Sequence, residues 1–194
     1  MKNKKYKLIA LVGKAGSGKD TILKEIEKLN NPIVHSIVSY TTRPGREGEV
    51  EGKDYYFVTE NEFKQMIDNH QMLEYVQFNN WWYGTGINCL RKNKLNIGIF
   101  NPSGIKALSA FPEIDLKIYG IVASDKQRLL RQLNREESPN VPEIIRRYAA
   151  DEQDFNNIKF NDVKIFVNED RNDLKNIVAE ITDHFWYAEL GKND

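Results

Sequence analysis

A glycine-rich turn near the start of the chain has the residue types and spacing of a phosphate-binding loop. It follows an apolar run, residues 8–12, opens a helix-like stretch, and reads Gly13-Lys14-Ala15-Gly16-Ser17-Gly18-Lys19-Asp20-Thr21. Glycines let successive backbone N–H groups converge on an anion, and the following helix adds its dipole. Lys19 supplies a charge for the β and γ phosphates. The pattern predicts a nucleotide site formed by Gly13, Ala15, Gly16, Ser17, Gly18, Lys19, Asp20 and Thr21.

The loop departs from the usual motif at Asp20, where a serine or threonine hydroxyl normally binds Mg²⁺. A carboxylate is also a hard oxygen ligand for Mg²⁺, directly or through water, although it adds negative charge beside a triphosphate. Thr21 does not simply replace the hydroxyl, because one helical residue rotates a side chain by about 100°. We therefore expect Asp20 to be the metal ligand.

Two arginines, Arg43 and Arg46, lie in a charged loop rich in glycine and proline. Guanidinium groups suit a phosphate, although a loop of this composition is by itself typical of a solvated surface. Phenols, a carboxylate and a hydroxyl follow within one compact stretch, at Tyr55, Tyr83, Glu74 and Thr85. This combination favours a second binding site over a bare surface loop.

Further arginines lie at 128, 131, 135, 146 and 147, on two helical stretches joined by a proline-marked loop. A basic helix face is commonly just solvated. Phosphoryl transfer, however, needs positive charge on the moving group and exclusion of water, and a closing lid provides both. We expect a helical lid at about residues 128–155.

Short β-branched runs at 34–38, 95–100, 116–122 and 163–167 alternate with helical periodicity. Helices are expected at 20–29, after Thr59, where Glu62 completes a capping box, and from near Ile105, Ser124 and Pro142. A closing helix carries an apolar stripe expected to face the core: Leu174, Ile177, Val178, Ile181 and Phe185. The alternation predicts an α/β fold, a parallel sheet with helices on both faces.

Residues 39–90 break this rhythm, because expected strands at 55–58 and 73–78 flank the helix after Thr59. The simplest explanation is a small mixed α/β insertion with its own sheet. We therefore expect a single domain over residues 1–194, with a core at 1–38 and 95–194, the insertion at about 39–90, and the lid within the core.

The composition excludes several classes of protein. The 28 basic residues balance 28 acidic ones, so no net field recruits nucleic acid or an anionic membrane. The single Cys89 forms no internal disulfide, which fits a reducing compartment. His35, His70 and His184 stand alone and are not expected to bind metal. No stretch is long and apolar enough to cross a bilayer, and we expect a cytoplasmic protein.

Taken together, the motifs resemble the guanylate kinase family along nearly the whole chain. The likeness rests on the P-loop, on Thr41-Thr42-Arg43-Pro44, Gly52-Lys53-Asp54-Tyr55-Tyr56-Phe57, Leu73-Glu74 and Tyr83-Gly84-Thr85, on the arginine-bearing helix pair, and on Val167-Asn168-Glu169-Asp170. The resemblance implies that Arg43, Arg46, Tyr55 and Tyr83 hold the phosphate of a nucleoside monophosphate. Glu49, in the same loop as the two arginines, is also expected to be a substrate-binding residue. The resemblance implies that Ser39, Glu74 and Thr85 contact the base. It also implies that Asn168 contacts the adenine of ATP and that Arg131, Arg135 and Arg147 act from the lid, with Arg146 an alternative to Arg147.

Hydrogen-bond chemistry agrees with the implied base. Guanine presents two adjacent donors, N1–H and the exocyclic amine, which the carboxylate of Glu74 accepts together. A hydroxyl of Ser39 or Thr85 donates to O6. Adenine has an acceptor at N1 and would leave Glu74 unpaired.

The sequence departs from the family after the expected strand at 95–100. The family has Asp-x-Asp-x-x-Gly there, whereas this chain reads Ile99-Phe100-Asn101-Pro102-Ser103-Gly104 and lacks both carboxylates. Those acids orient the monophosphate-binding arginine and hold water around Mg²⁺, so metal geometry and substrate choice stay open.

We expect a kinase that transfers the γ-phosphoryl group of ATP, with Mg²⁺, to GMP or dGMP. Lys19, Arg43, Arg131, Arg135 and Arg147 would carry the catalysis by positioning and charge. Nucleotides are the expected partners, with neither nucleic acid nor a membrane, and the protein is expected to be a monomer or homodimer. Two alternatives stay open. Asp20 and Asn101 are compatible with a kinase for other deoxynucleoside monophosphates, and a non-catalytic guanylate-kinase-like module would bind peptides.

Overall fold

The computed structural model describes residues 5–135, 137–156 and 162–190, with side chains as far as residue 183. The elements are β1 (Tyr6–Val12), α1 (Lys19–Lys28), β2 (Val34–Ser36), β3 (Tyr40–Thr41), β4 (Tyr56–Phe57), α2 (Glu60–Asp68), β5 (Met72–Phe78), β6 (Trp81–Gly86), a 3-10 turn η1 (Ile87–Cys89), β7 (Leu95–Ile99), α3 (Pro102–Leu108), β8 (Ile114–Val122), α4 (Asp125–Leu133), α5 (Val141–Asn156), β9 (Val163–Val167) and α6 (Arg171–Leu190).

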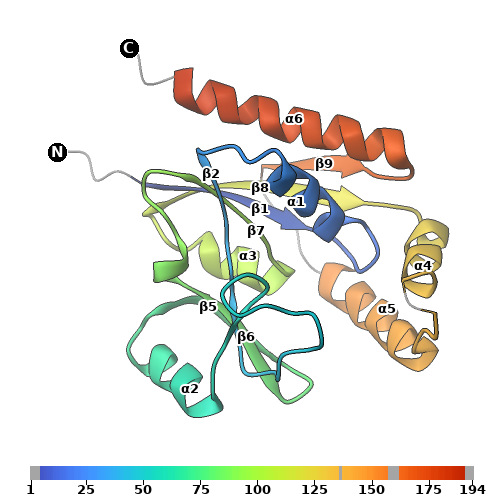
Figure 1. The fold of residues 1–194 in the computed structure, drawn as a ribbon, viewed down its shortest axis with the longest axis horizontal. Coiled ribbons are helices and arrows are strands. Elements are labelled where there is room, and N and C mark those ends of the chain that lie inside the picture. Colours follow the sequence, from blue (N-terminus) through green and yellow to red (C-terminus); the bar gives the residue numbers. More distant parts are fainter. Residues whose placement is uncertain (1–4, 136, 157–161, 191–194) are drawn as a thin grey trace. The chain divides into compact units, whose positions relative to one another are not determined.

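Two sheets organise the fold (Figure 1). One has five strands in the order β2-β7-β1-β8-β9, and both the β2–β7 pair and the β8–β9 pair are parallel. The other has four strands in the order β4-β3-β6-β5. The predicted α/β fold, a parallel sheet flanked by helices with a small mixed insertion, is confirmed. None of the helices in the described part of the chain is long and apolar enough to span a membrane.

The contacts within the chain divide it into two compact units, and the boundaries between them fall within β1, β7, α3 and β8 and in the segment before β2. The first, here called the insertion unit, contains Ile33–Gly98, Ser103–Leu116 and the start of β1. The second, here called the P-loop unit, contains Ile9–Pro32, Ile99–Pro102 and the chain from Lys117 onwards.

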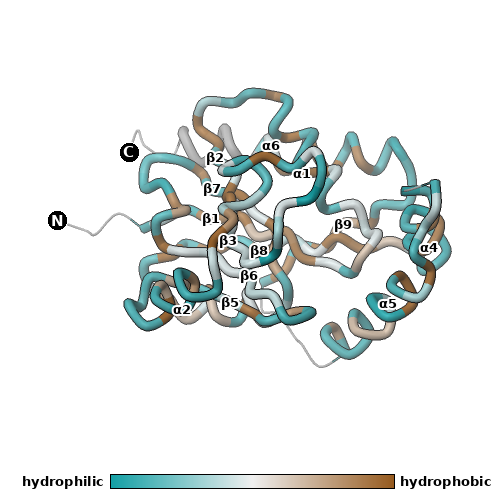
Figure 2. Tube along the Cα trace, turned by 60° about the horizontal axis from the view of Figure 1, so that its bottom comes forward, coloured by the Kyte–Doolittle hydropathy of each residue, from teal (hydrophilic) through white to brown (hydrophobic). Residues whose placement is uncertain are grey.

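In the P-loop unit, helix α1 packs against α6, and both lie beside the strands (Figure 1). The second half of β1 is entirely buried, as the apolar run predicts, and Figure 2 colours this strand as hydrophobic. Ile22 and Ile26 of α1 and Ile177 and Ile181 of α6 are buried as well. The predicted apolar stripe of the closing helix therefore faces the core, although the side chain of Phe185 lies outside the described part.

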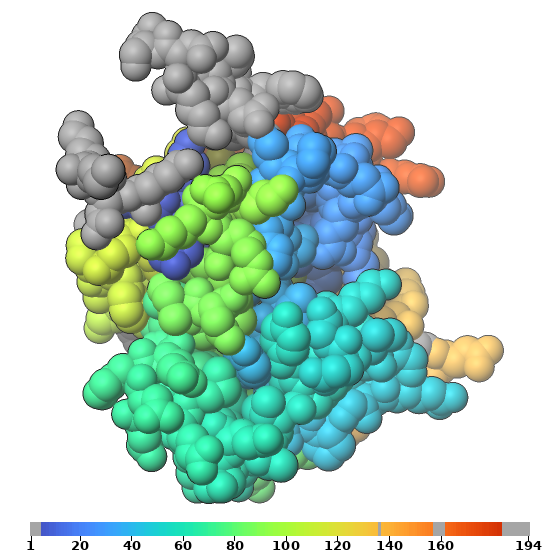
Figure 3. Space-filling model, turned by 60° about the vertical axis from the view of Figure 1, so that its left-hand side comes forward, coloured from blue at the N-terminus to red at the C-terminus, as the bar shows by residue number. Residues whose placement is uncertain are grey.

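In the insertion unit, α2 begins as the sequence predicts. The Thr59 hydroxyl accepts from the Glu62 N–H at 3.2 Å, and the Glu62 carboxylate accepts from the Thr59 N–H at 2.7 Å. Phe63 on this helix is fully buried and stacks on Trp82 of β6, with 5.9 Å between ring centroids. The residues of α2 and of the neighbouring loops, blue-green in Figure 3, form a continuous part of the surface.

Several elements differ from the sequence prediction, among them β8, which begins at Ile114 and not at 116, and β3, which was not expected. Helix α3 begins at Pro102 and not near Ile105, because proline fits the first helical turn, where an N–H has no partner to lose. Strand β2 ends at Ser36, two residues before the expected 38. Strand β6 was not predicted, although it pairs with both β3 and β5, because its glycines weaken the strand pattern.

Candidate active site

The loop between β1 and α1 has the backbone that its glycines predict. Gly18 precedes α1 in the left-handed region, with φ of 99°, where other residues are strained. A Cβ at Gly13 would lie 2.1 Å from the Ile121 carbonyl oxygen, so only glycine fits there. The loop therefore passes close to β8, and its chain turns directly into the N-terminus of α1.

Lys19 folds back over this loop, and its ammonium donates to the Lys14 carbonyl at 3.1 Å. Burial lowers the pKa of Lys19, although the negative charges of Asp20 and Asp151 partly offset this effect. The fold thus places a poorly solvated cation at the loop. Asp20 and Thr21, which follow it, are both exposed on the first turn of α1.

Asn168, which follows β9, reaches the same loop. Its amide nitrogen donates to the Ser17 carbonyl at 2.8 Å. The Asn168 Oδ1 and the Ser17 hydroxyl are buried and have no hydrogen-bond partner among the described residues. Buried polar atoms are normally paired, so these two atoms are positioned to meet a ligand at the loop.

Arg131 of α4 ties the loop to the segment after β9. Its NH1 donates to the carbonyls of Gly16 and Ser17, each at 3.3 Å, and its NH2 donates to those of Asn168 at 2.9 Å and Glu169 at 3.1 Å. The residue predicted to act from a lid therefore contacts the P-loop directly. Its cation lies beside the carbonyl side of the anion-binding turn.

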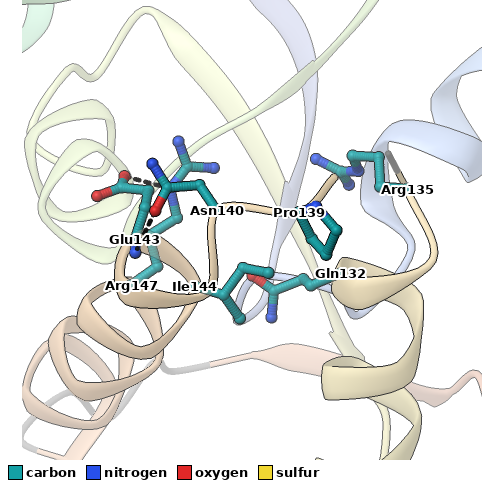
Figure 4. Close-up of a pocket in the computed structure, with 7 residues that line it drawn as sticks. All are labelled: Gln132, Arg135, Pro139, Asn140, Glu143, Ile144 and Arg147. Carbon is teal, nitrogen blue, oxygen red and sulfur yellow. Dashed lines mark hydrogen bonds and ion pairs between the residues drawn. The ribbon is translucent and has the colours of Figure 1, made fainter. Parts of the chain in front are cut away.

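Arg135 and Arg147 line one small pocket of about 80 Å³ between the end of α4 and the start of α5 (Figure 4). Arg147 donates to Glu143 at 2.8 Å, and Arg146 makes a two-pronged contact with the same carboxylate at 2.7 and 2.9 Å. These bonds, led by that from Arg146, lower the pKa of Glu143 to about 2. Of the two candidate arginines, Arg147 is among the residues that line this pocket and Arg146 is not.

Sequence reasoning gave no role to Arg128, Asp151 or Glu152, which also contact the P-loop. Arg128 is 2% exposed, and its Nε donates to the Ala15 carbonyl at 3.0 Å. Asp151 accepts from the Ala15 N–H at 2.6 Å, and Glu152 pairs with Lys14 at 2.5 Å. The sequence signal for this contact is weak, because Asp151 and Glu152 are two of several carboxylates that α4 and α5 carry beside their arginines.

In the insertion unit, Arg43 is the centre of the expected phosphate site. It is 5% exposed and pairs with both oxygens of Glu49, at 3.0 and 2.8 Å. Its guanidinium lies 5.5 Å from the ring centre of Tyr55, and the Tyr55 ring meets that of Tyr83 edge-on at 6.1 Å. The hydrogen bond from Arg43 is the main cause of the lowered pKa of Glu49.

Arg46 contributes its backbone here, because its N–H donates to Glu49 at 2.7 Å while its side chain is exposed. The structure thus brings together Arg43, Glu49, Tyr55 and Tyr83. It leaves the guanidinium of Arg46 in solvent at the edge of this cluster.

The residues expected to contact a base form a second cluster in the same unit. Glu74 of β5 lies opposite Thr85 of β6, and Thr85 is fully buried. Burial raises the pKa of Glu74, and hydrogen bonds from the Thr85 hydroxyl and backbone partly offset it. The Ser39 hydroxyl lies 3.0 Å from that of Thr85. A carboxylate and two hydroxyls therefore stand side by side at one end of the four-stranded sheet.

Fewer side chains are placed to bind a metal ion than to bind anions at the P-loop or around Arg43. No group of three or more His, Cys, Asp or Glu side chains within the described ranges is arranged to hold an ion. Asp20 makes no hydrogen bond or ion pair to another described residue, and its exposed carboxylate follows Lys19. This chemistry fits a Mg²⁺ ion that takes most of its remaining ligands from water and phosphate.

Comparison with known proteins agrees with this geometry. The family description "Guanylate kinase" matches residues 5–186. A guanylate kinase of Prochlorococcus marinus (strain MIT 9312) is 40% identical over 139 residues, covering 69% of this chain and 73% of that protein. One of Wigglesworthia glossinidia brevipalpis is 31% identical over 183 residues, covering 92% and 87%. The crystal structure of guanylate kinase from Anaplasma phagocytophilum has a TM-score of 0.65 at 18% identity, covers 95% and 87%, and supports the fold.

Proposed function

We propose that this chain, which belongs to the guanylate kinase family, transfers the γ-phosphoryl group of ATP to GMP or dGMP. The proposal rests mainly on Glu74, which lies opposite Thr85, and on the Ser39 hydroxyl 3.0 Å from that of Thr85, in a chain that also has the glycines and Lys19 of a P-loop. Few other bases offer two adjacent donors to a carboxylate. The cluster around Glu74 would bind the acceptor nucleotide, and the P-loop would bind the phosphate donor, ATP.

The base cluster divides its roles according to its hydrogen bonds. The Glu74 carboxylate accepts from guanine N1–H and from the exocyclic amine. The Thr85 hydroxyl already donates to Glu74, so it orients the carboxylate. The Thr85 proton is then used, so the half-buried Ser39 hydroxyl donates to Thr85 at 3.0 Å in the absence of substrate and would turn to donate to O6 when guanine binds.

The acceptor phosphate is held by Arg43 with Tyr55 and Tyr83, and Arg46 adds charge from the exposed side. Glu49 forms an ion pair with Arg43, so it fixes the orientation of the guanidinium group before the substrate binds. Pre-positioning of this kind lowers the entropy lost on binding. The buried Nε of Arg43 has no partner among the described residues and remains available to a phosphate oxygen.

At the donor site, the backbone of the P-loop and Lys19 hold the phosphates, and Asn168 offers its Oδ1 to the adenine amine. Arg131, Arg135 and Arg147 supply positive charge for the transferred group. The acceptor phosphate is an oxyanion at neutral pH, so no side chain need act as a nucleophile. Catalysis is then positioning and charge stabilisation.

Mg²⁺ would be held by Asp20 and would neutralise charge on the β and γ phosphates. We expect Asp20→Ala to raise the Mg²⁺ concentration at half-maximal activity about tenfold, the lower end of the usual loss when a metal-site residue is removed. A Mg²⁺ titration at saturating ATP measures it. Glu25→Gln, a carboxylate change elsewhere on α1, is the control. Superimposable titration curves for Asp20→Ala and the unchanged chain would exclude Asp20 as the metal ligand.

A kinase for other deoxynucleoside monophosphates is the second candidate. Asp20 and Asn101 favour it, because both depart from the family pattern where metal and substrate are placed. A non-catalytic module has less support, since Lys19 and the loop glycines are all present. We propose further that the enzyme is cytoplasmic, which the balanced charge and the buried Cys89 support, and that it is a monomer or homodimer.

A panel of nucleoside monophosphates in a coupled assay of ADP release separates these candidates. We expect turnover with GMP or dGMP, and a kcat/KM at least about 100-fold lower with AMP, because adenine leaves the half-buried Glu74 unpaired. Comparable rates with dTMP or dCMP would contradict the guanine assignment. An absence of turnover with every acceptor would favour the binding module.

A further inference from the structure

The anion-binding turn of the P-loop already holds an anion from its own chain. The Asp151 carboxylate of α5 accepts from the backbone N–H of Ala15 at 2.6 Å. The last turns of α5 lie beside the loop that joins β1 and α1 (Figure 1). Backbone N–H groups of such a loop are the donors that cradle nucleotide phosphates. Asp151 therefore occupies a donor that a phosphate would use.

A buried arginine holds the carboxylate in this position. Arg128 donates to Asp151 at 3.1 Å and to Asp125 at 3.0 Å, and its guanidinium lies 4.6 Å from the ring centre of Tyr148. At 2% exposure, its charge is shielded from water, so its pairing with Asp151 is little weakened by salt. The contact is thus anchored from α4 and is not a chance surface pair.

The next residue makes a parallel contact on the neighbouring part of the loop. Glu152 pairs with Lys14 at 2.5 Å and lies 3.6 Å from Arg128. Two successive carboxylates of α5 are thereby fixed to Lys14 and Ala15. The Coulomb attraction between Asp151 and Lys19 also favours the position of Asp151 at the P-loop.

We propose that Asp151 determines the affinity of the P-loop for ATP by competing with a nucleotide phosphate for the Ala15 N–H. The inference rests on the proposed function, because it concerns the ATP site of that reaction. One N–H does not satisfy two anions at once, and phosphate beside an unmoved carboxylate meets like-charge repulsion. Binding of the triphosphate therefore requires Asp151 to leave, and the free energy of breaking its hydrogen bond to Ala15 reduces the apparent affinity.

The affinity of the full-length chain for ATP and for inorganic tripolyphosphate, without Mg²⁺, tests the competition. We expect Asp151→Asn to tighten both about tenfold, because a neutral acceptor forms a hydrogen bond about half as strong as a charged one and repels no phosphate. Asp154→Asn, an exposed carboxylate on the same helix, should change them less than about twofold by calorimetric titration. Omitting Mg²⁺ separates competition from metal binding.

Equal or weaker binding by Asp151→Asn would overturn the competition, and weaker binding only when Mg²⁺ is added would make Asp151 a metal ligand instead. If neither the unchanged chain nor Asp151→Asn binds ATP, the proposed function fails, whereas equal ATP affinities refute only the role of Asp151. The unchanged chain gives a second measurement, should the variant not fold. The ¹³C shift of the Asp151 carboxyl should move when tripolyphosphate binds, and a constant shift with bound tripolyphosphate would refute displacement.

Discussion

Replacing Lys19 by methionine is expected to lower kcat about 1,000-fold, at the upper end of the usual loss when one preorganised charge donor is removed. The Lys19 ammonium is the one P-loop side-chain cation that the motif directs to the β and γ phosphates. Methionine keeps a similar unbranched stem and removes the charge. The measurement is steady-state release of ADP at saturating ATP and GMP.

The same substitution is expected to leave the melting temperature unchanged or slightly higher. Burial lowers the pKa of Lys19, which means that the folded state disfavours the ammonium relative to the unfolded chain. Below the unfolded pKa the buried ammonium reduces stability, and this penalty is greatest below the folded pKa and disappears as pH rises to the unfolded pKa. A neutral side chain removes the penalty at neutral pH.

Lys28→Met is the matched control, because Lys28 lies at the other end of α1 and is exposed. It should alter neither kcat nor the melting temperature appreciably. If Lys19→Met lost activity only together with a fall in melting temperature, the lysine would be structural. If it kept normal turnover, the P-loop would have no part in the reaction.

The sequence predicted those parts of the site that short segments encode. The P-loop needs glycines within a few residues of each other, so its conformation follows from local sterics. The capping box at Thr59 is equally local. Glu74 was identified because it stands between recognisable neighbours in the chain, and β5 and β6 then bring Thr85 opposite it.

The parts that the sequence did not predict depend on distant contacts. Ala15 and Asp151 are 136 residues apart, and no periodicity connects a loop amide to a carboxylate on a later helix. The sequence favours a solvated position for Arg128, because charged side chains are rarely fully buried without partners, whereas it is 2% exposed in the structure. Its partners, Asp125 and Asp151, become visible only when α4 and α5 are placed against the loop.

Replacing Glu74 by glutamine is expected to lower kcat/KM for GMP about 100-fold. Two hydrogen bonds to a charged acceptor contribute about 1.5–3 kcal/mol each, and glutamine keeps only part of one of them. A loss of about 2.7 kcal/mol corresponds to that factor. The effect should lie mainly in KM, because Glu74 contacts the base and not the transferred group. Initial rates over a range of GMP concentrations measure it.

Selectivity should change together with affinity. A glutamine side chain both donates and accepts, which matches the N1 acceptor and the amine donor of adenine. The ratio of kcat/KM for GMP to that for AMP should therefore fall in Glu74→Gln. Glu60→Gln, an exposed carboxylate of α2 paired with Lys64, should leave the ratio unchanged.

The pH dependence of KM for GMP provides an independent test of the role of Glu74. Burial raises the pKa of Glu74, so protonation begins at a higher pH than for an exposed glutamate, and the protonated group no longer accepts from both guanine donors. KM for GMP should rise as pH falls through this range. The GMP phosphate also titrates near pH 6, but it does so equally with either enzyme. The difference between the profiles of the unchanged chain and Glu74→Gln therefore isolates Glu74, and parallel profiles would show that its ionisation is not used to bind the base.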